Sequence, residues 1–165
     1  MRRYLLLIVL LITSLSCEQT QAQELSTLLD ELNNETVDYC NPSYLSKVGL
    51  DSNLLLDTRK KEEYEVSHIP GAIWVGEHPK AKQVIQLIKP QHERIVVYCS
   101  VGVRSEDAGE DLSSLNLPVF NLYGGIFLYN EQVGGLVNSK HRPTDSVHTY
   151  SKRWSKYLKK GIAVW

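Results

Sequence analysis

The chain has 165 residues, with 18 Lys and Arg against 19 Asp and Glu, and a formal net charge of −1 at pH 7. Its length suits one domain with short extensions, and such a balanced charge offers no general attraction to a polyanion. We therefore expect no nucleic-acid partner.

The first residues have the order of an export signal. Two arginines precede an apolar run at residues 4–12, and small or polar residues follow it. This run is shorter than the roughly 17 residues that span a bilayer. Two cleavage positions remain open: one before Cys17, which resembles a bacterial lipoprotein signal and would leave Cys17 lipidated, and a soluble-export one ending at Ala22. We expect residues 1–22 to direct the protein to the periplasm or cell envelope, with a lipid at Cys17 as its route to membrane attachment.

Residues 23–48 are expected to form an N-terminal helix and a linker. Leucines at 25, 28, 29 and 32 have helical spacing. The Asn, Pro and Gly residues that follow indicate a loop-rich segment before the main domain.

Residues 49–158 alternate short apolar runs with runs of helical character. The expected strands are 54–56, 73–75, 95–98 and 119–122, and the expected helices are 60–66, 80–88 and 106–115. The strands are continuously apolar, which is typical of strands buried on both faces. The pattern predicts an α/β fold, a small parallel sheet with helices on both faces, whose functional loops lie at the carboxyl ends of the strands.

The end of this range predicts a C-terminal helix. Asp145 suits a helix cap, and the apolar residues 147, 150, 154 and 158 follow a three-four spacing. Lysines and one arginine occupy the other positions. We expect this helix to dock on the domain with its basic face in solvent; a membrane-surface or partner-binding helix is the alternative.

Cys99 is the main candidate for chemistry. It follows the expected strand 95–98 and precedes a glycine-bearing loop and a helix, so that backbone N–H groups and a helix N-terminus aim at one sulfur. The nucleophile of sulfur chemistry is the thiolate, and this placement favours the anion. Gly102 permits a tight curl, and Arg104 adds a permanent charge and a planar donor fork. We predict Cys99 as the catalytic residue and the following as substrate-binding residues: Ser100, Val101, Gly102, Val103, Arg104 and Ser105.

Other reactive side chains receive no catalytic role. The histidines lack metal-ligand spacing, so neither a metal nor a cofactor is predicted. An inert core role for Cys99 is the alternative to catalysis. A Cys40–Cys99 disulfide, which would inactivate the thiolate in an oxidising compartment, also stays open.

Four segments in this order resemble the rhodanese-like sulfurtransferases, over about residues 50–129. They are Leu-Leu-Leu-Asp-Thr-Arg at 54–59, His-Ile-Pro-Gly-Ala at 68–72, Cys-Ser-Val-Gly-Val-Arg-Ser at 99–105 and Val-Phe-Asn-Leu-Tyr-Gly-Gly-Ile at 119–126. The resemblance implies sulfur transfer through a Cys99 persulfide. The donor would be thiosulfate or a persulfide, oriented by Arg104, and the acceptor would be cyanide, a small thiol or a protein cysteine. It also implies that Asp57 and Arg59 stabilise turns around the loop. His68 precedes Pro70 and Gly71, and we expect it to anchor that turn by hydrogen bonding rather than to act as a base.

Two other functions stay open. Dual-specificity phosphatases and arsenate reductases of related fold also use a cysteine loop ending in arginine, but with five intervening residues where this chain has only the four from Ser100 to Val103. The smaller loop favours a sulfur atom over a tetrahedral phosphate. The third function is a non-catalytic binding or redox-sensing module of the cell envelope.

Overall fold

The computed structural model describes residues 25–114 and 118–165. The chain divides into two units, Met1–Leu32 and Asn33–Trp165. The described part of the first unit is a helix at residues 25–32, as the leucine spacing predicts. The expected export signal, including Cys17, lies outside the described residues. Over the described ranges, no helix has the length and apolar character needed to cross a membrane.

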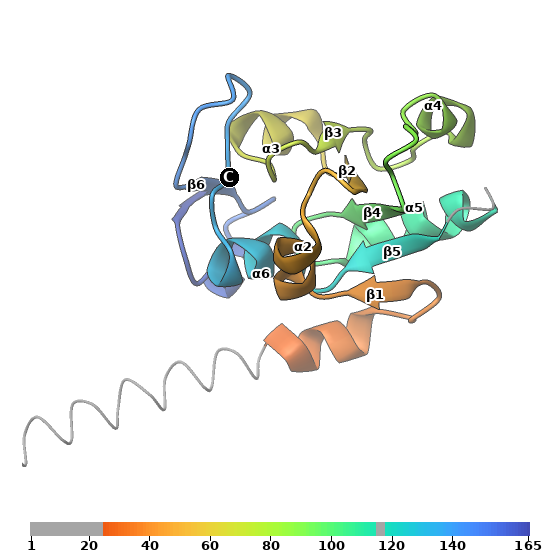
Figure 1. Ribbon diagram of the computed structural model, residues 1–165. Coiled ribbons are helices and arrows are strands. Elements are labelled where there is room, and N and C mark those ends of the chain that lie inside the picture. The colour runs from red at the N-terminus through yellow and green to blue at the C-terminus, as the bar shows by residue number, and fades with distance from the viewer. Residues whose placement is uncertain (1–24, 115–117) are drawn as a thin grey trace, which may run out of the picture. The chain divides into compact units, whose positions relative to one another are not determined.

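The second unit is built on a five-stranded parallel sheet with the strand order β1-β5-β4-β2-β3 (Figure 1). This confirms the predicted α/β fold. The strands are β1 (Asp38–Cys40), β2 (Asn53–Asp57), β3 (Ile73–Trp74), β4 (Arg94–Tyr98) and β5 (Val119–Leu122). All five carboxyl ends point toward the side of the molecule where the C-terminal segment lies (Figure 1).

Helices connect the strands, as parallel pairing requires. They are α2 (Pro42–Val48), α3 (Lys61–Val66), α4 (Ala81–Ile85), α5 (Val103–Ser113) and α6 (Gly125–Gln132). In Figure 1, α2 and α6 lie in front of the sheet and α5 lies behind β4 and β5. Both faces of the sheet are therefore covered, which explains the continuously apolar strands.

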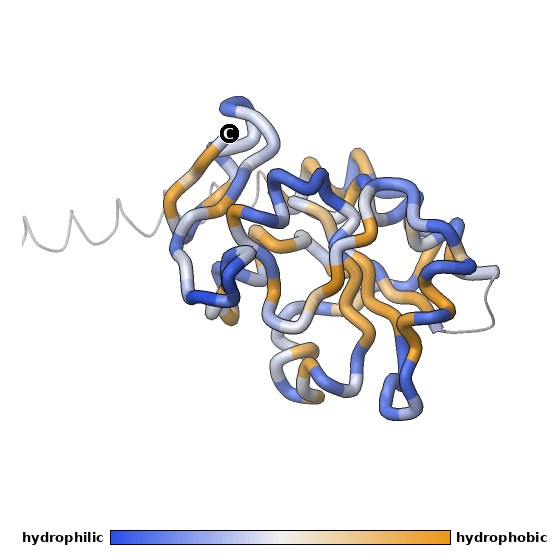
Figure 2. Tube along the Cα trace, turned by 90° about the horizontal axis from the view of Figure 1, so that it is seen from above, coloured by the Kyte–Doolittle hydropathy of each residue, from blue (hydrophilic) through white to orange (hydrophobic). Residues whose placement is uncertain are grey.

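The core lies between the central strands and the helices. Every residue of β2 is buried, and alternate residues of β2 and β4 pack with Val84 of α4 and Leu112 of α5. Figure 2 shows the hydrophobic stretches gathered along the strands and the hydrophilic ones on the surrounding turns. Each fully buried aliphatic side chain contributes about 1.5–3 kcal/mol, so these two strands form a rigid base for the loops at their ends.

The segment expected to be a linker contains two regular elements, so its prediction as loop was wrong. Strand β1 pairs with β5, matching Cys40 with Leu122, and α2 begins with Pro42. Three residues are too few for a periodic signal, and only pairing with β5 identifies them as a strand. Cys40 is thus a buried sheet residue, and both Cys40 and Cys99 are free thiols.

The predicted C-terminal helix was also wrong. In its place lie strand β6 (Ser146–His148), the 3-10 turn η1 (Ser155–Tyr157) and strand β7 (Ile162–Val164), with β6 and β7 paired in parallel. Val147 is fully buried whereas Tyr150 is 46% exposed, so the apolar residues do not share one face. The β-branched and aromatic residues of this stretch have weak helix propensity, and pairing with β7 decides the outcome. Strand β6 lies against α3, near the carboxyl ends of the sheet (Figure 1).

Candidate active site

Cys99 lies directly after β4, at the start of the loop that leads into α5. Its side chain is 1% exposed, and the N–H of Gly102 donates a hydrogen bond to Sγ over 3.2 Å. Gly102 is the residue that precedes α5, and its φ of +107° favours glycine. The N-terminus of an eleven-residue helix, with its partial positive charge, therefore faces this sulfur.

Helix α6 holds the loop from the carbonyl side. Its Ile126 N–H donates to the carbonyl of Cys99 over 3.0 Å, and its Phe127 N–H donates to the carbonyl of Ser100 over 3.2 Å. A Cβ at Gly125, which begins α6 at φ +54°, would lie 2.5 Å from the Cys99 carbonyl oxygen. Because Gly125 has no Cβ, the start of α6 can lie against the loop. Its backbone N–H groups there bind the carbonyl oxygens of Cys99 and Ser100.

Asn121, a fully buried residue of β5, holds the other end of the loop. Its Nδ2 donates to the carbonyl of Gly102 over 2.7 Å, and its Oδ1 accepts a hydrogen bond from the hydroxyl of Ser105 over 2.7 Å. The carbonyls of Cys99, Ser100 and Gly102 and the start of α5 are therefore fixed by neighbouring elements. A buried polar network of this kind specifies one loop conformation.

A second network joins the loop to α3 through Arg104. Arg104 Nη1 and Nη2 donate to the two carboxylate oxygens of Glu63 over 2.9 Å each, in a bidentate pair. The hydroxyl of Ser100 accepts from Arg104 Nη2 over 3.0 Å and donates to Glu63 over 3.1 Å. The Glu63 side chain is fully buried and also accepts a hydrogen bond from the backbone N–H of Lys60, the residue that precedes α3.

These contacts set the charge states of the pair. Burial alone would raise the pKa of Glu63, but the hydrogen bonds and charge of Arg104, with Arg59 and the Lys60 N–H, hold it below the usual range. Burial alone would lower the pKa of Arg104, but Glu63, an electrostatic interaction with Cys99, and Glu77 raise it. The guanidinium is therefore permanently charged and lies within electrostatic range of the Cys99 sulfur.

Two further residues cover Arg104 at the outer side of the site. Glu77, in the segment after β3, accepts a hydrogen bond from Nη1 over 3.0 Å, and its side chain is 37% exposed. The ring of Tyr150 lies 4.8 Å from the Arg104 guanidinium carbon and 5.2 Å from Lys60 Nζ. Tyr150 adopts φ +63° and its N–H donates to Nδ1 of His148. The C-terminal segment thus contributes an aromatic ring to the mouth of the site.

Asp57 ends β2, and Arg59, two residues later, forms an ion pair with it. Both are fully buried, and Arg59 donates through Nε and Nη2 to Asp57 and through Nη2 to the carbonyl of Ser67 over 2.6 Å. His68 binds the carbonyl of Tyr64 through Nδ1. These contacts are those of turn-stabilising residues.

The predicted site residues lie together, but several of their side chains bind other protein groups and not an open substrate position. Ser100, Val101 and Ser105 are buried, and the Ser100 and Ser105 hydroxyls bind protein groups. Arg104 was expected to receive an anionic donor, whereas the structure shows its fork bound to carboxylates. Over residues 25–114 and 118–165, no group of His, Cys, Asp and Glu side chains is arranged to hold a metal ion.

Four residues of the site had no role predicted from the sequence: Glu63, Glu77, Asn121 and Tyr150. A polar Asn121 within an apolar strand was an available signal, and so was Glu63 at the start of a helix. Glu77 lies in an irregular segment without any pattern. Tyr150 was missed because the helix predicted there was wrong.

Comparisons with known proteins agree with this architecture. Residues 41–132 match the rhodanese-like domain family. The tRNA uridine(34) hydroxylase of Streptococcus pyogenes serotype M5 is 32% identical over 110 residues, covering 58% of this chain and 31% of that protein. The same protein of Streptococcus agalactiae serotype III gives the same values. The chain thus spans 31% of the length of the curated relatives it matches.

Solved structures show the same fold. A rhodanese-related protein from Thermoplasma volcanium has a TM-score of 0.52 at 24% identity, covering 61% of this chain and 97% of that one. A thiosulfate sulfurtransferase from Pseudomonas aeruginosa has a TM-score of 0.55 at 23% identity, and the match covers 65% of this chain and 21% of that one. An As-Sb reductase from Leishmania major has a TM-score of 0.53 at 16% identity, and the match covers 65% of this chain and 91% of that one. At these identities the likeness concerns the fold alone.

The family match extends over residues 41–132 of a chain of 165, and it includes the Cys99 loop and the helices that hold it. It confirms the resemblance seen in the sequence. The chain belongs to the rhodanese-like domain family, which includes sulfurtransferases and related enzymes.

Proposed function

We propose that this protein is a sulfurtransferase that carries sulfur as a persulfide on Cys99. The Cys99 thiolate attacks the outer sulfur of a donor, a new S–S bond forms at Sγ, and the donor's own bond to that sulfur breaks with the electron pair leaving on the donor. An acceptor thiolate or cyanide then attacks the outer sulfur of the persulfide. The Cys99–sulfur bond breaks, the sulfur leaves on the acceptor, and Cys99 returns to the thiolate.

The observation that carries this proposal is the position of Cys99 Sγ at the N-terminus of α5. The Gly102 N–H donates to it, and the carbonyls of Cys99 and Ser100 are bound by α6 rather than directed at the sulfur. The helix start and the Arg104 charge both stabilise a negative sulfur, either the thiolate or the terminal sulfur of a persulfide. No proton transfer to a leaving group is needed, since thiolates and sulfite are stable anions.

The phosphatase and arsenate alternative receives less support from this geometry. A phosphate dianion would need the Arg104 fork, and Glu63 and Glu77 already bind it. The four-residue spacing between Cys99 and Arg104 also gives the smaller loop. The tRNA activity named for the curated relatives belongs to proteins of which this chain spans 31%.

Mass spectrometry of the protein after incubation with a sulfane donor tests the proposal. We expect a gain of one sulfur atom on Cys99, which a thiol such as dithiothreitol removes, and no phosphate release from an aryl phosphate. Phosphate release without persulfide formation would instead favour the phosphatase function. A Cys99 thiol that is blocked in the natively purified protein would favour the binding or redox-sensing module.

We also propose that the protein is exported, with Cys17 as its lipidation site. The support is the sequence order of residues 1–22, with basic residues, an apolar run and two cleavage positions. Labelling of bacterial cells with a fatty acid should mark the wild-type protein and not the Cys17→Ser variant. An N-terminus found at Gln23 instead would identify the soluble-export alternative, and a protein that keeps its first residues would exclude both.

A further inference from the structure

The Arg104 guanidinium has one partner that a substrate could replace. Its four terminal N–H groups bind both oxygens of Glu63, Ser100 Oγ and Oε1 of Glu77. Glu63 is fully buried and holds two of these bonds, and Ser100 is part of the loop itself. Glu77 holds a single bond and its side chain is 37% exposed. An anion that reaches the fork must therefore displace Glu77.

One flat face of the guanidinium is covered by Tyr150. The Tyr150 ring lies 4.8 Å from the guanidinium carbon, within cation–π distance, and restricts access from that side. Along the edge that carries the four terminal N–H groups, Glu77 is the partner that lies nearest to solvent. Glu77 thus acts as an internal anion that occupies the position in which a charged donor would bind.

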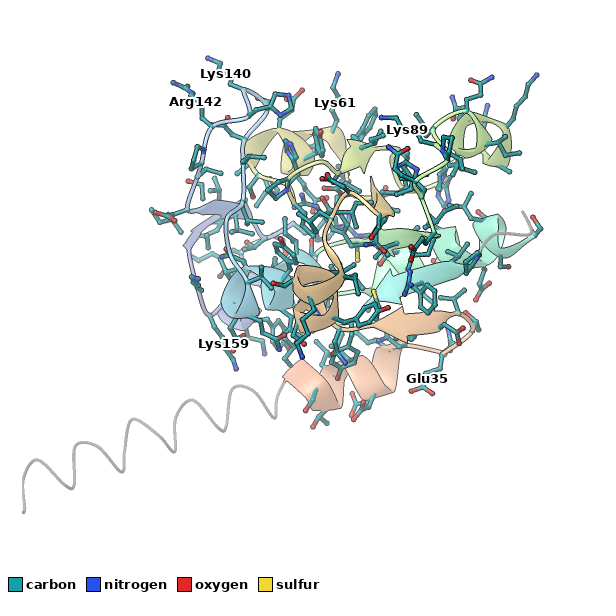
Figure 3. All side chains as sticks on the ribbon, in the orientation of Figure 1. Glu35, Lys61, Lys89, Lys140, Arg142 and Lys159 are labelled. Atoms are coloured by element: carbon teal, nitrogen blue, oxygen red, sulfur yellow. The ribbon has the colours of Figure 1, made fainter. Side chains whose placement is uncertain are left out.

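The charged groups at the mouth also balance one another. Arg104 and Lys60 are cationic, and Glu63 and Glu77 are anionic, so these four groups sum to zero. Lys61, the neighbouring lysine, extends outward from the molecule in Figure 3, with Nζ 5.8 Å from the Trp74 ring. A dianion such as thiosulfate therefore gains little attraction at the mouth and approaches a site whose nucleophile is itself negative.

We propose that Glu77 is a specificity-determining residue that directs the site toward organic persulfides, which carry at most one negative charge on the persulfide group and react as the neutral hydropersulfide RS–SH, and against the thiosulfate dianion. This inference rests on the proposed function and names its substrate class. The Cys99 thiolate attacks the outer sulfur of RS–SH, the RS–SH bond breaks, and RS⁻ leaves with the electron pair and takes a proton from water. The product is Cys99–S–SH, so atoms and charge balance without any other reactant.

The test compares two donors on variants of the whole protein. The rate of sulfur addition to Cys99 is measured by mass spectrometry with thiosulfate and with freshly prepared 2-mercaptoethanol hydropersulfide, whose carrier has no charged group besides the persulfide itself. Glu77→Gln keeps a hydrogen-bond acceptor and removes the charge, and Glu77→Ala removes both. Glu65→Gln is the matched control, because it makes the same charge change on α3 at a side chain that is 54% exposed and pairs only loosely with Lys61 at 4.0 Å.

We expect Glu77→Gln and Glu77→Ala to raise the thiosulfate rate about fivefold, the factor of a screened ion pair, while the hydropersulfide rate changes less than about twofold. The Glu65→Gln control should leave both rates near wild type. An unchanged ratio of the two rates, or a parallel change in both, overturns the specificity role of Glu77. Failure of the wild type to take sulfur from either donor would instead reject the proposed function itself, so the two failures are distinguishable.

Discussion

The two cysteines in the described part of the chain occupy equivalent places in the sheet. Cys40 ends β1 and Cys99 follows β4, so both lie at the carboxyl ends of parallel strands. Both are buried, at 7% and 1% exposure. Neither burial nor position on the sheet distinguishes them.

Their electrostatic surroundings differ. Burial raises the pKa of Cys40 to about 12, and the charge of Arg94 offsets only part of this effect. Cys40 is therefore a protonated thiol at neutral pH. Cys99 instead receives the Gly102 N–H, faces the start of α5 and interacts with the Arg104 charge. The comparison teaches that the loop after the strand, rather than the degree of burial, makes a cysteine a candidate nucleophile.

The largest expected effect comes from replacing each cysteine by serine in turn. Cys99→Ser should abolish persulfide formation, because it removes the atom to which the new S–S bond forms. Cys40→Ser, at a site with no shared partner, should keep the rate within about twofold of wild type. Mass spectrometry of both variants after donor treatment measures this. Sulfur retained on Cys40 in the Cys99→Ser variant would show that the two thiols are interchangeable.

A second way to sharpen the comparison is to disturb the Cys99 loop alone. Gly125→Ala places a Cβ 2.5 Å from the Cys99 carbonyl oxygen at φ +54°, so the loop must shift. We expect a large loss of persulfide formation, with a loss of about 1–3 kcal/mol in the free energy of unfolding. The control is Gly49→Ala, which has φ +83° but no atom within 4 Å of the added Cβ. Equal activity losses in the two variants would mean that backbone strain, and not the loop contact, is responsible.

Asn121 should have a smaller effect. Asn121→Ala removes one hydrogen bond from the Gly102 carbonyl and one from the Ser105 hydroxyl, and leaves the 3.2 Å bond that these two groups make with each other. We expect the free energy of unfolding to fall by about 1–3 kcal/mol. Because the start of α5 then loosens, alkylation of Cys99 by iodoacetamide should also slow. Asn53→Ala is the control, since Asn53 donates to the Gly49 carbonyl over 2.7 Å at the amino end of β2. It should lower stability without changing the alkylation rate, and a slower rate in that variant contradicts the prediction.

The smallest effect concerns pH. The folded-state pKa of Glu63 lies below its ordinary value of 4.5, so the ionised Glu63–Arg104 pair stabilises the fold above that pH. This stabilisation is lost as the pH falls through the folded-state pKa. Glu63→Gln should therefore weaken the acid dependence of urea unfolding below about pH 4.5. An identical pH profile in the variant would show that the pair contributes no linkage.

The central strands could be predicted from the sequence because strands that are buried on both faces consist of continuous apolar residues. Continuous apolar runs mark β2, β4 and β5 within one or two residues, and the helix after Cys99 was expected three residues later than Val103, where α5 begins. The start of α5 includes the polar Arg104 and Ser105, which show no helical periodicity. Strand β1 and the β6–β7 pair were missed, because short strands depend on partners distant in sequence.

In the candidate site, too, the residues close together in the sequence were predicted and those brought in by the fold were not. Cys99, Gly102 and Arg104 were found because they are contiguous and their chemistry is local. Glu77 and Tyr150 reach Arg104 from segments that only the fold brings together. The order of residues within one segment predicts which loop carries the thiol. The contacts that neutralise the charge of Arg104 come from other segments, so the order of residues in the loop cannot predict them.

The pairing of β1 with β5 has a practical consequence. The family match begins at residue 41, after β1 ends at Cys40. A chain shortened to the matched range would leave β5 as an open sheet edge, with unpaired backbone donors and acceptors that invite aggregation. Asn121 lies on that strand and pairs with Tyr39 in the sheet. A truncation before residue 41 would therefore disturb the strand that carries Asn121 and, through Asn121, the Cys99 loop. The three residues of β1 belong to the folded domain although they precede the family match.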